Sequence, residues 1–321
     1  MRLRIWGARG SIPTPITTPE MRRRLHEVLV RSQGVNLDSS EAIDRFLDRL
    51  PASLTSVVSG NTSCFEVRAG EQLFIFDLGS GSRLLGKALM QEEFGQGQGT
   101  AHIFISHTHW DHIEGFPFFT PAYVPGNQLH FYTPFEDIEW RLRQLMGAPF
   151  FPVELDYPQA TRSYHTLKPG HPHQINDVQI EMIPLHHPGT SYAYKLQGGG
   201  KTLVYANDAE YPQMDQQFTA PYEDFFRGAD VLIFDAMYTY EAAVTSKVDW
   251  GHSTPKAGAE LAWRAGVKRL ILTHHDPEDA DIALWSKIED ADQHIRFRNT
   301  RTSEERPLEV LLATEGLTLE I

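Results

Sequence analysis

The chain has 321 residues, with enough apolar sequence for one large domain or two modest ones. Its formal net charge of −13 argues against a broad electrostatic grip on a nucleic-acid polymer, which normally needs a basic face. No run of residues is apolar for long enough to span a bilayer, and the first five residues do not resemble a signal peptide. The single cysteine, Cys64, excludes an intramolecular disulfide framework and fits a reducing compartment, so we expect a cytoplasmic location without membrane contact.

Residues 15–57 interrupt an otherwise strand-rich start with two predicted helices. The first follows Thr17 and Thr18 and has apolar residues with helical spacing. Before the second, Asp38 stands three residues ahead of Glu41, as in a capping arrangement. We expect a helical insertion that packs on its own domain, forms the contact of a homodimer, or covers the site as a lid.

Short apolar runs that predict strands recur along the chain, and several end in polar residues. Residues 63–67 and 72–76 predict a hairpin, and the second of these runs leads into Asp77. The later predicted strands are residues 102–105, 179–183, 202–205, 231–234 and 269–272. They lead, respectively, into His107, the pair His186 and His187, Asp208, Asp235, and the pair His274 and His275. Polar groups that collect at the same ends of strands are typical of sites in α/β proteins.

Two helices are predicted between these strands, over residues 82–90 and 256–265. The second opens with Thr254 as a capping residue, has Pro255 at its first position and closes at Gly266.

Residues 107–112 place three imidazoles and one carboxylate directly after a predicted buried strand. Residues two apart in an extended segment point the same way, so His107 and His109 can hold one metal ion together. Asp111 and His112 follow and can reach a second ion. The segment therefore predicts a metal site, in preference to four solvated polar side chains in a loop.

These residues resemble the metallo-β-lactamase-fold hydrolases, and within them the phosphodiesterase branch related to ribonuclease Z and bacterial cyclic-nucleotide phosphodiesterases. Asp77, residues 107–112, His187, Asp208 and His274 occur in the order of that family. Residues 6–13 and 60–64 are similar to the opening of its bacterial phosphodiesterase-like members. The resemblance implies an α/β fold, a four-layer αβ/βα sandwich with metals between the sheets at one edge. It also implies one domain over residues 1–321, with the helical insertion at 15–57 within it.

The resemblance implies a centre for two divalent ions, zinc or manganese, with iron as a further possibility. The ligands it implies are His107, His109 and His187 for one ion, Asp111, His112 and His274 for the other, and Asp208 as a bridge. His186 and His275 are the alternatives to their neighbours His187 and His274. Asp77 is expected to orient a ligand or its loop, with a structural cap of the turn at Gly79 as the alternative.

The implied reaction is attack of a metal-bound hydroxide on phosphorus, with Asp111 orienting the water or taking its second proton. His252 is expected to donate to a phosphate oxygen or to the leaving oxygen, paired with Asp235 as in ribonuclease Z-like enzymes. Ser253 and Thr254, with His252, open a helix whose backbone N–H groups suit an anionic substrate. The alternative is that His252 serves only as part of a helix cap.

The long projecting arm, rich in glycine and basic residues, by which ribonuclease Z grips transfer RNA is not evident in this sequence. A small phosphodiester is therefore favoured over an extended nucleic acid, and a cyclic nucleotide is the best candidate. The alternatives are a ribonuclease Z-like RNA-processing nuclease, a lactonase or thioesterase on the same fold, and a non-catalytic nucleotide-binding protein.

Overall fold

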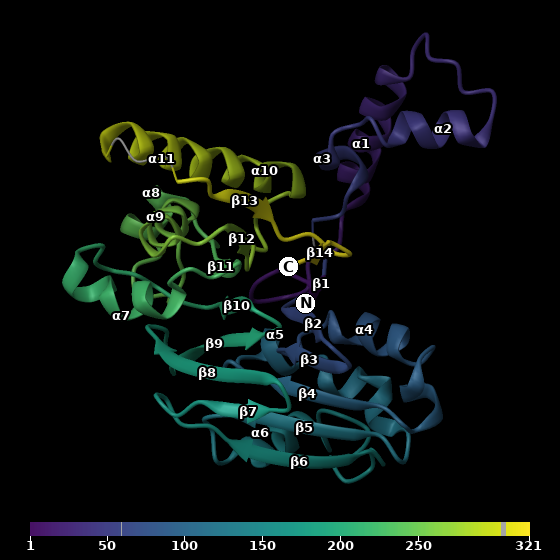
Figure 1. Cartoon of the computed structure of the whole chain (residues 1–321). Coiled ribbons are helices and arrows are strands. Elements are labelled where there is room, and N and C mark those ends of the chain that lie inside the picture. Colours follow the sequence, from purple (N-terminus) through teal and green to yellow (C-terminus); the bar gives the residue numbers. More distant parts are fainter. Residues whose placement is uncertain (59, 303–305) are drawn as a thin grey trace.

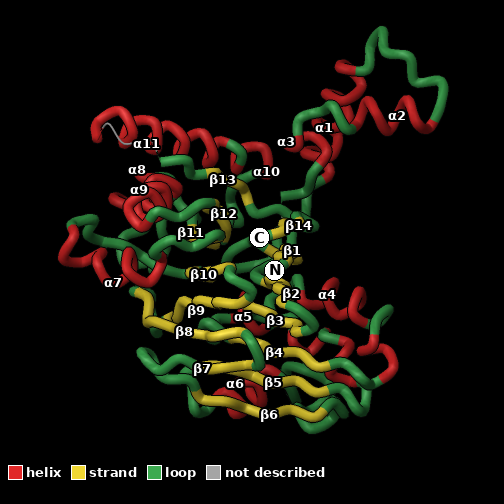
Figure 2. Tube along the Cα trace, in the orientation of Figure 1, coloured by secondary structure: helices red, strands yellow, loops and turns green. Residues whose placement is uncertain are grey.

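The structure, a computed structural model that describes residues 1–58, 60–302 and 306–321, contains two seven-stranded sheets (Figures 1 and 2). Across the first sheet the strands are β14 (Thr318–Glu320), β1 (Arg2–Gly7), β2 (Cys64–Ala69), β3 (Gln72–Phe76), β4 (Thr100–Phe104), β5 (Gln128–Thr133) and β6 (Thr161–Thr166). Across the second they are β13 (Glu309–Leu312), β12 (Arg269–Thr273), β11 (Val231–Asp235), β10 (Lys201–Ala206), β9 (Ser191–Gly198), β8 (Val178–Leu185) and β7 (His173–Ile175). Strands β3 to β6 and β10 to β13 run parallel, and the remaining neighbours are antiparallel.

Helices cover the outer faces of both sheets (Figure 1). The α-helices are α1 (Thr18–Arg31), α2 (Ser40–Leu47), α3 (Ala52–Thr55), α4 (Ser82–Leu89), α5 (Trp110–Ile113), α6 (Ile138–Leu145), α7 (Gln216–Phe226), α8 (Tyr240–Thr245), α9 (Pro255–Ala265), α10 (Asp281–Leu284) and α11 (Ser286–Thr302). Three 3-10 helices are η1 (Glu93–Gln96), η2 (Phe116–Phe118) and η3 (Thr120–Tyr123). No helix among the described residues combines the length and apolarity that crossing a membrane requires.

The predicted limits of α9 are confirmed by its capping contacts. Thr254 Oγ1 accepts the Ala257 N–H at 3.2 Å, and Gly266 ends the helix in the left-handed region with φ of 68°. The predicted cap of α2 is wrong by one residue, because Ser39, not Asp38, accepts the Ala42 N–H at 3.2 Å. Asp38 instead lies in a local turn in which its own N–H donates to Asn36 Oδ1.

Apolar side chains form three layers that hold the sandwich together. The central layer fills the space between the sheets and includes Phe76, Phe104, Tyr194 and Ile233, all fully buried. A second layer joins the first sheet to α4 and α6, and a third joins the second sheet to α7, α9 and α11. The order is therefore helices, sheet, sheet and helices, which confirms the predicted four-layer fold.

The parallel strands of both sheets end at one common edge, and their last residues are polar. Asp77 directly follows β3, and its N–H donates to Phe104 O at the end of β4. In the second sheet Asp235 ends β11 and His274 directly follows β12. The polar ends of strands from both sheets thus meet along the line where the two sheets adjoin, which we call the seam.

Helices α1 to α3 form an N-terminal arm, residues 18–55, that projects away from the sandwich (Figure 1). Met21, Leu25 and Leu29, spaced four apart on α1, are 45%, 56% and 67% exposed, so this apolar stripe is not packed on the protein's own domain. The arm carries six arginines and six carboxylates, so its formal charge is zero.

One buried carboxylate anchors the base of the N-terminal arm. Asp281 accepts hydrogen bonds from Arg9 at 2.9 Å, from Arg24 of α1 at 2.8 Å and from the Val58 N–H at 2.9 Å. The Asp281 side chain is 5% exposed, so its charge is balanced almost entirely by these donors.

Replacement Asp281→Ala should therefore lower the free energy of unfolding by about 3–5 kcal/mol, because it removes the buried carboxylate that forms ion pairs with both Arg9 and Arg24. Urea unfolding followed by circular dichroism measures the change. Asp156→Ala is the matched control: Asp156 pairs with Arg143 but is 73% exposed, so its loss should change stability little. Equal effects of the two replacements would contradict the structural role of Asp281.

Candidate metal centre

Seven side chains converge at the seam as two groups of possible metal ligands. The first group is His107, His109, His187 and Asp208, and the second is Asp111, His112, His274 and Asp208. Within each group the ligand atoms all lie within 4.8 Å of one another. His107, His109, Asp111 and His112 follow β4 in the first sheet, whereas His187, Asp208 and His274 follow β8, β10 and β12 in the second.

The two oxygens of Asp208 face different groups. Oδ2 lies 3.6 Å from His107 Nε2 and 3.9 Å from His187 Nε2. Oδ1 lies 3.1 Å from both His112 Nε2 and His274 Nε2. In a tetrahedral or octahedral metal site the ligand atoms lie about 3–3.5 Å apart, so the two separations at Oδ1 suit coordination of a common ion, and the two at Oδ2 are slightly longer.

Unpaired buried atoms support metal binding at this position. His107 Nε2, His112 Nε2 and Asp208 Oδ1 are inaccessible to solvent and have no hydrogen-bond partner among the described residues. Buried polar atoms without a partner are costly in a folded protein unless they serve a ligand. Nitrogen and carboxylate oxygen are also the donor types that zinc, manganese and iron accept.

In three of the imidazoles, Nδ1 makes a hydrogen bond that directs Nε2 into the centre. His112 Nδ1–H donates to Asp77 Oδ2 at 2.7 Å, and His187 Nδ1–H donates to Gly251 O at 2.8 Å. The Ser106 hydroxyl donates its proton to Asp77 Oδ2, so its oxygen can accept from His107 Nδ1–H at 3.2 Å. In each ring the Nε2 lone pair is then available to a cation.

The protein environment sets the charges of these groups. Burial and the neighbouring imidazole of His112 hold the pKa of His107 well below its usual range, which favours the neutral ring that a metal requires. Burial alone would raise the pKa of Asp208, but the imidazoles of His112 and His274 lower it well below the usual value. Burial lowers the pKa of His112, yet Asp208 and other carboxylates raise it overall, so a proton and a cation compete for this ring.

Three residues of the centre have backbone conformations that L-amino acids rarely adopt. Asp77, Asp208 and His274 have φ of 58°, 54° and 58°, each just beyond the end of a strand. Such left-handed residues are uncommon outside glycine and asparagine, and they cluster at functional sites. The turns therefore aim these three side chains into the seam at some cost in backbone energy.

The segment around Gly10 closes one side of the centre. A Cβ on Gly10 would lie 2.5 Å from the His274 ring, so only glycine fits there. The next residue, Ser11, donates its backbone N–H to Asp111 Oδ2 at 2.8 Å. Residues 6–13 resemble the opening of other family members, but no pattern in the sequence predicts the contact of Ser11 with Asp111.

His252 and Asp235 are in direct contact beside the second group. His252 Nδ1–H donates to Asp235 Oδ2 at 2.8 Å, and the His252 ring stacks on that of His274 with centroids 4.8 Å apart. Asp235 is itself held by the N–H groups of Ala209 and Met237. Burial lowers the pKa of His252, but Asp235 raises it to about 9. The Thr254 hydroxyl caps α9 and Ser253 is buried, so their role in anion binding stays a prediction.

The two neighbouring histidines lie outside both groups. His186 is exposed and packs edge-on against Phe218 with ring centroids 6.4 Å apart. His275 is fully buried, and its Nε2 lies 3.1 Å from Ala313 O, away from the centre. Geometry therefore favours His187 and His274 as the ligands.

Glu210 supports the centre indirectly, through the loop that contacts His187, and the sequence did not predict this role. Its carboxylate accepts the N–H groups of Asp249 at 3.1 Å and Gly251 at 3.0 Å, and Gly251 O in turn receives His187 Nδ1–H. Glu210 lies two positions after Asp208, but no spacing rule connects it with a loop some forty residues later. Only the folded chain reveals this contact.

Comparison with known proteins identifies the family. The family model described as "Beta-lactamase superfamily domain" matches residues 82–275. The chain belongs to the β-lactamase superfamily. The match spans the 107–112 segment, His187, Asp208 and His274, so the candidate centre lies within the region that defines the superfamily. This chain is a metal-dependent hydrolase of the β-lactamase superfamily.

Individual superfamily members show similarity over most of the chain. Ribonuclease Z of Porphyromonas gingivalis strain W83 is 26% identical over 259 residues, which cover 66% of this chain and 82% of that protein. The metallo-β-lactamase fold protein YhfI of Bacillus subtilis matches with a TM-score of 0.62 at 19% identity, covering 100% of this chain and 98% of that one. Yeast PDE1 matches with a TM-score of 0.59 at 13% identity, covering 100% and 99%. The two structural likenesses establish the fold.

Replacement Asp77→Asn tests the support beneath the centre. An amide cannot accept from all four donors that the carboxylate receives, so His112 should lose its fixed orientation. We expect metal affinity, measured by competition with a chromogenic chelator, to fall roughly 10-fold to 100-fold. Asp281→Asn is the control, because it changes another buried carboxylate outside the centre. Unchanged affinity in Asp77→Asn would show that Asp77 serves the turn alone.

Proposed function

We propose that this superfamily member is a dinuclear metal-dependent phosphodiesterase that hydrolyses a small phosphodiester, with a cyclic nucleotide as the favoured substrate. The observation that carries the proposal is the placement of Asp208, whose two oxygens each face a separate group of ligands. His107, His109 and His187 would hold one ion, Asp111, His112 and His274 the other, and Asp208 would bridge them. Zinc and manganese both suit this set of imidazole and carboxylate donors, and iron would also fit.

When bound, two divalent ions lower the pKa of a water and polarise the phosphoryl oxygens, which supplies the nucleophile for hydrolysis. The chain's own groups supply orientation and protons. Asp111, fixed by the Ser11 N–H, is placed to orient the attacking water. His252, whose Nδ1–H is held by Asp235, can donate its Nε2 proton to the leaving oxygen.

A small substrate is supported by charge. The formal net charge of −13 opposes binding of an extended polyanion, and the N-terminal arm, whose formal charge is zero, does not change that total. A cyclic nucleotide carries a single phosphodiester, which the charge of two cations would offset locally.

A second candidate, a ribonuclease Z-like nuclease, is favoured by the sequence similarity that covers 82% of the Porphyromonas gingivalis protein. The two candidates differ in substrate, so metal-loaded protein should be given cyclic mononucleotides, cyclic dinucleotides and a transfer RNA precursor in parallel. Faster cleavage of the RNA would favour the second candidate.

A homoserine lactone and a thioester, tested beside bis(p-nitrophenyl) phosphate, cover the lactonase and thioesterase alternatives. No turnover of any substrate by fully loaded protein would favour a binding protein.

Replacement Asp208→Ala should remove metal and activity together, because both groups lose a shared ligand. Metal content after dialysis, measured by inductively coupled plasma mass spectrometry, should fall from two ions per chain. Turnover of bis(p-nitrophenyl) phosphate should fall with it. Asp156→Ala, an exposed aspartate, should keep both. Two retained ions in Asp208→Ala would rule out the bridging assignment.

Replacement His252→Ala should keep the metal content and lower the turnover of an alkyl phosphodiester roughly 100-fold to 10,000-fold, because a positioned proton donor is removed. Asp235→Asn should have an effect in the same direction, since it removes the acceptor that orients the ring. His186→Ala removes an exposed histidine close in sequence to the centre and serves as control. Wild-type turnover in His252→Ala would reduce His252 to part of a helix cap.

A further inference from the structure

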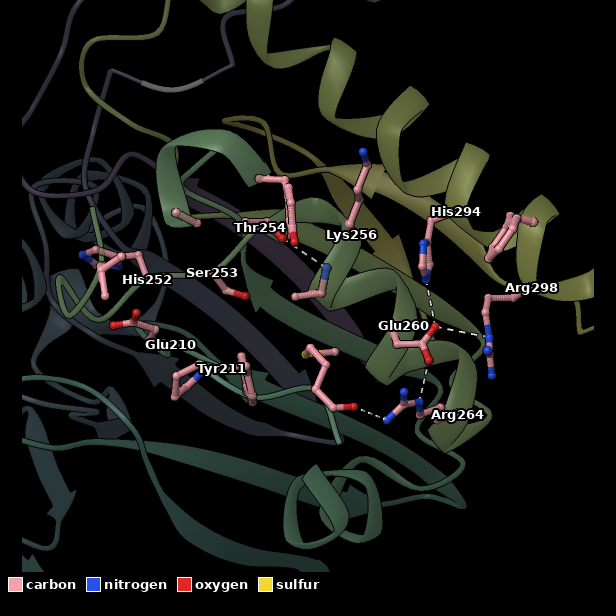
Figure 3. Close-up of a pocket in the computed structure, with 17 residues that line it drawn as sticks. Glu210, Tyr211, His252, Ser253, Thr254, Lys256, Glu260, Arg264, His294 and Arg298 are labelled. Atoms are coloured by element: carbon pink, nitrogen blue, oxygen red, sulfur yellow. Dashed lines mark hydrogen bonds and ion pairs between the residues drawn. The ribbon is translucent and has the colours of Figure 1, made fainter. Parts of the chain in front are cut away.

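A hollow of about 570 Å³ begins at His252 and extends along α9 toward α11 (Figure 3). We call it the His252 pocket. His252 and Glu210 lie at one end, and His294 and Arg298 lie at the other (Figure 3). Its volume lies within the range of about 300–1,000 Å³ that small-molecule sites usually have.

The side walls of the His252 pocket are mostly apolar and aromatic. They include Tyr211, Met214, Tyr240, Val248 and Phe297. Tyr240 and Phe297 are 61% and 52% exposed, although aromatic side chains of this size usually gain by burial. Exposed rings along a hollow are the arrangement on which a planar heterocycle stacks.

The far end of the pocket is polar and tightly paired. Glu260 accepts from Arg264 Nε at 2.6 Å and contacts His294 at 2.8 Å and Arg298 at 3.2 Å (Figure 3). This network holds the polar side chains in place while leaving the apolar walls accessible. A ligand with a flat apolar body suits these walls, and polar edges on it would face the charged side chains at the far end.

The near end of the pocket shares its wall with the candidate metal centre. Glu210 lines the pocket and fixes the N–H groups of Asp249 and Gly251, while His252 both lines the pocket and stacks on His274. If His252 donates a proton to the leaving oxygen, the carbon skeleton attached to that oxygen lies on the side of His252. His252 lines the near end of the pocket, so a carbon skeleton held beside this residue can extend into it.

We propose that the His252 pocket binds the alcohol portion of the phosphodiester, and that this portion is a nucleoside whose base stacks on the exposed ring of Tyr240 or of Phe297. The inference rests on the proposed phosphodiesterase function and adds to it the location and chemical class of the group that carries the leaving oxygen, which in a cyclic nucleotide stays attached to the product when the ring opens. A nucleoside has a planar heterocycle and polar edges that suit the walls and far end of the pocket.

A second aromatic hollow, on the other side of the ligand set, is the competing position for the base. Trp110, Trp140 and Phe150 line it and are 78%, 59% and 86% exposed. Trp110 lies between the candidate ligands His109 and Asp111, but this hollow contains no group placed to protonate a leaving oxygen. It provides a matched control, since its exposed rings are similar in kind to Tyr240 and Phe297.

The test is binding of adenosine 5′-monophosphate, the product class, to metal-loaded protein by isothermal titration calorimetry, with inorganic phosphate as the probe that lacks a base. The double variant Tyr240→Ala with Phe297→Ala should weaken binding of the mononucleotide roughly 5-fold to 100-fold and leave phosphate affinity unchanged. Ala257→Phe, which fills the pocket from the first turn of α9, should do the same. Trp140→Ala should bind both probes like the wild type.

Each other result overturns the inference. Failure of the wild type to bind the mononucleotide more tightly than phosphate removes the need for a nucleoside site. Unchanged mononucleotide affinity in the pocket variants, or a loss in Trp140→Ala instead, places the base elsewhere. Turnover of bis(p-nitrophenyl) phosphate by the wild type distinguishes failure of the pocket assignment from failure of the proposed function. If the wild type cleaves this substrate, only the pocket assignment has failed. If it cleaves no phosphodiester, the proposed function fails whatever the binding data show.

Discussion

The buried carboxylate of Asp77 is the contact on which the rest of the centre depends. It accepts from the Ser106 N–H, the Ser106 hydroxyl, His112 Nδ1–H and the Tyr205 hydroxyl, each at 2.7 Å. Ser106 and His112 belong to the first sheet's side of the seam, and Tyr205 lies on β10 of the second. A fully buried charge is tolerable only when it is surrounded by donors in this way. The bond from Tyr205 therefore ties the two sheets together, and the bond from His112 fixes the orientation of a candidate metal ligand.

The chemistry of the site follows from its position at the seam. Each candidate ion would draw ligands from both sheets, and Asp208 would link the two ions from the second sheet alone. The apolar layer between the sheets, with Phe76, Phe104 and Tyr194, holds the two halves in one relative position. His252, the proposed proton donor, comes from a separate loop that is tied to the centre through Glu210 and Gly251. The His252 ring itself is held by Asp235, which is not one of the seven candidate ligands, so replacements at these two residues can separate the proposed proton donation from metal binding.

Local patterns in the sequence predicted much of this arrangement. Strand ends, the 107–112 segment and the caps of α9 depend on neighbouring residues, and they were recognisable from spacing and residue type. The choice between His187 and His186 came from resemblance, and geometry favours it. Contacts such as Ser11 with Asp111 and Glu210 with Gly251 join segments far apart in the chain, and no periodicity encodes them. The direction of the N-terminal arm depends on Asp281, which meets Arg24 across 257 positions and for the same reason was not predictable.

The distance in sequence between the candidate ligands limits when they can come together during synthesis of the chain. Asp111 meets His274 across 163 positions, so the second group of candidate ligands cannot form from the 107–112 segment alone. A nascent polypeptide that has emerged only as far as β9 already carries the four ligands that follow β4, together with His187, but lacks Asp208 and His274. Closing so long a loop costs chain entropy that later contacts must offset. The second group of candidate ligands can therefore be completed only after β12 has been synthesised.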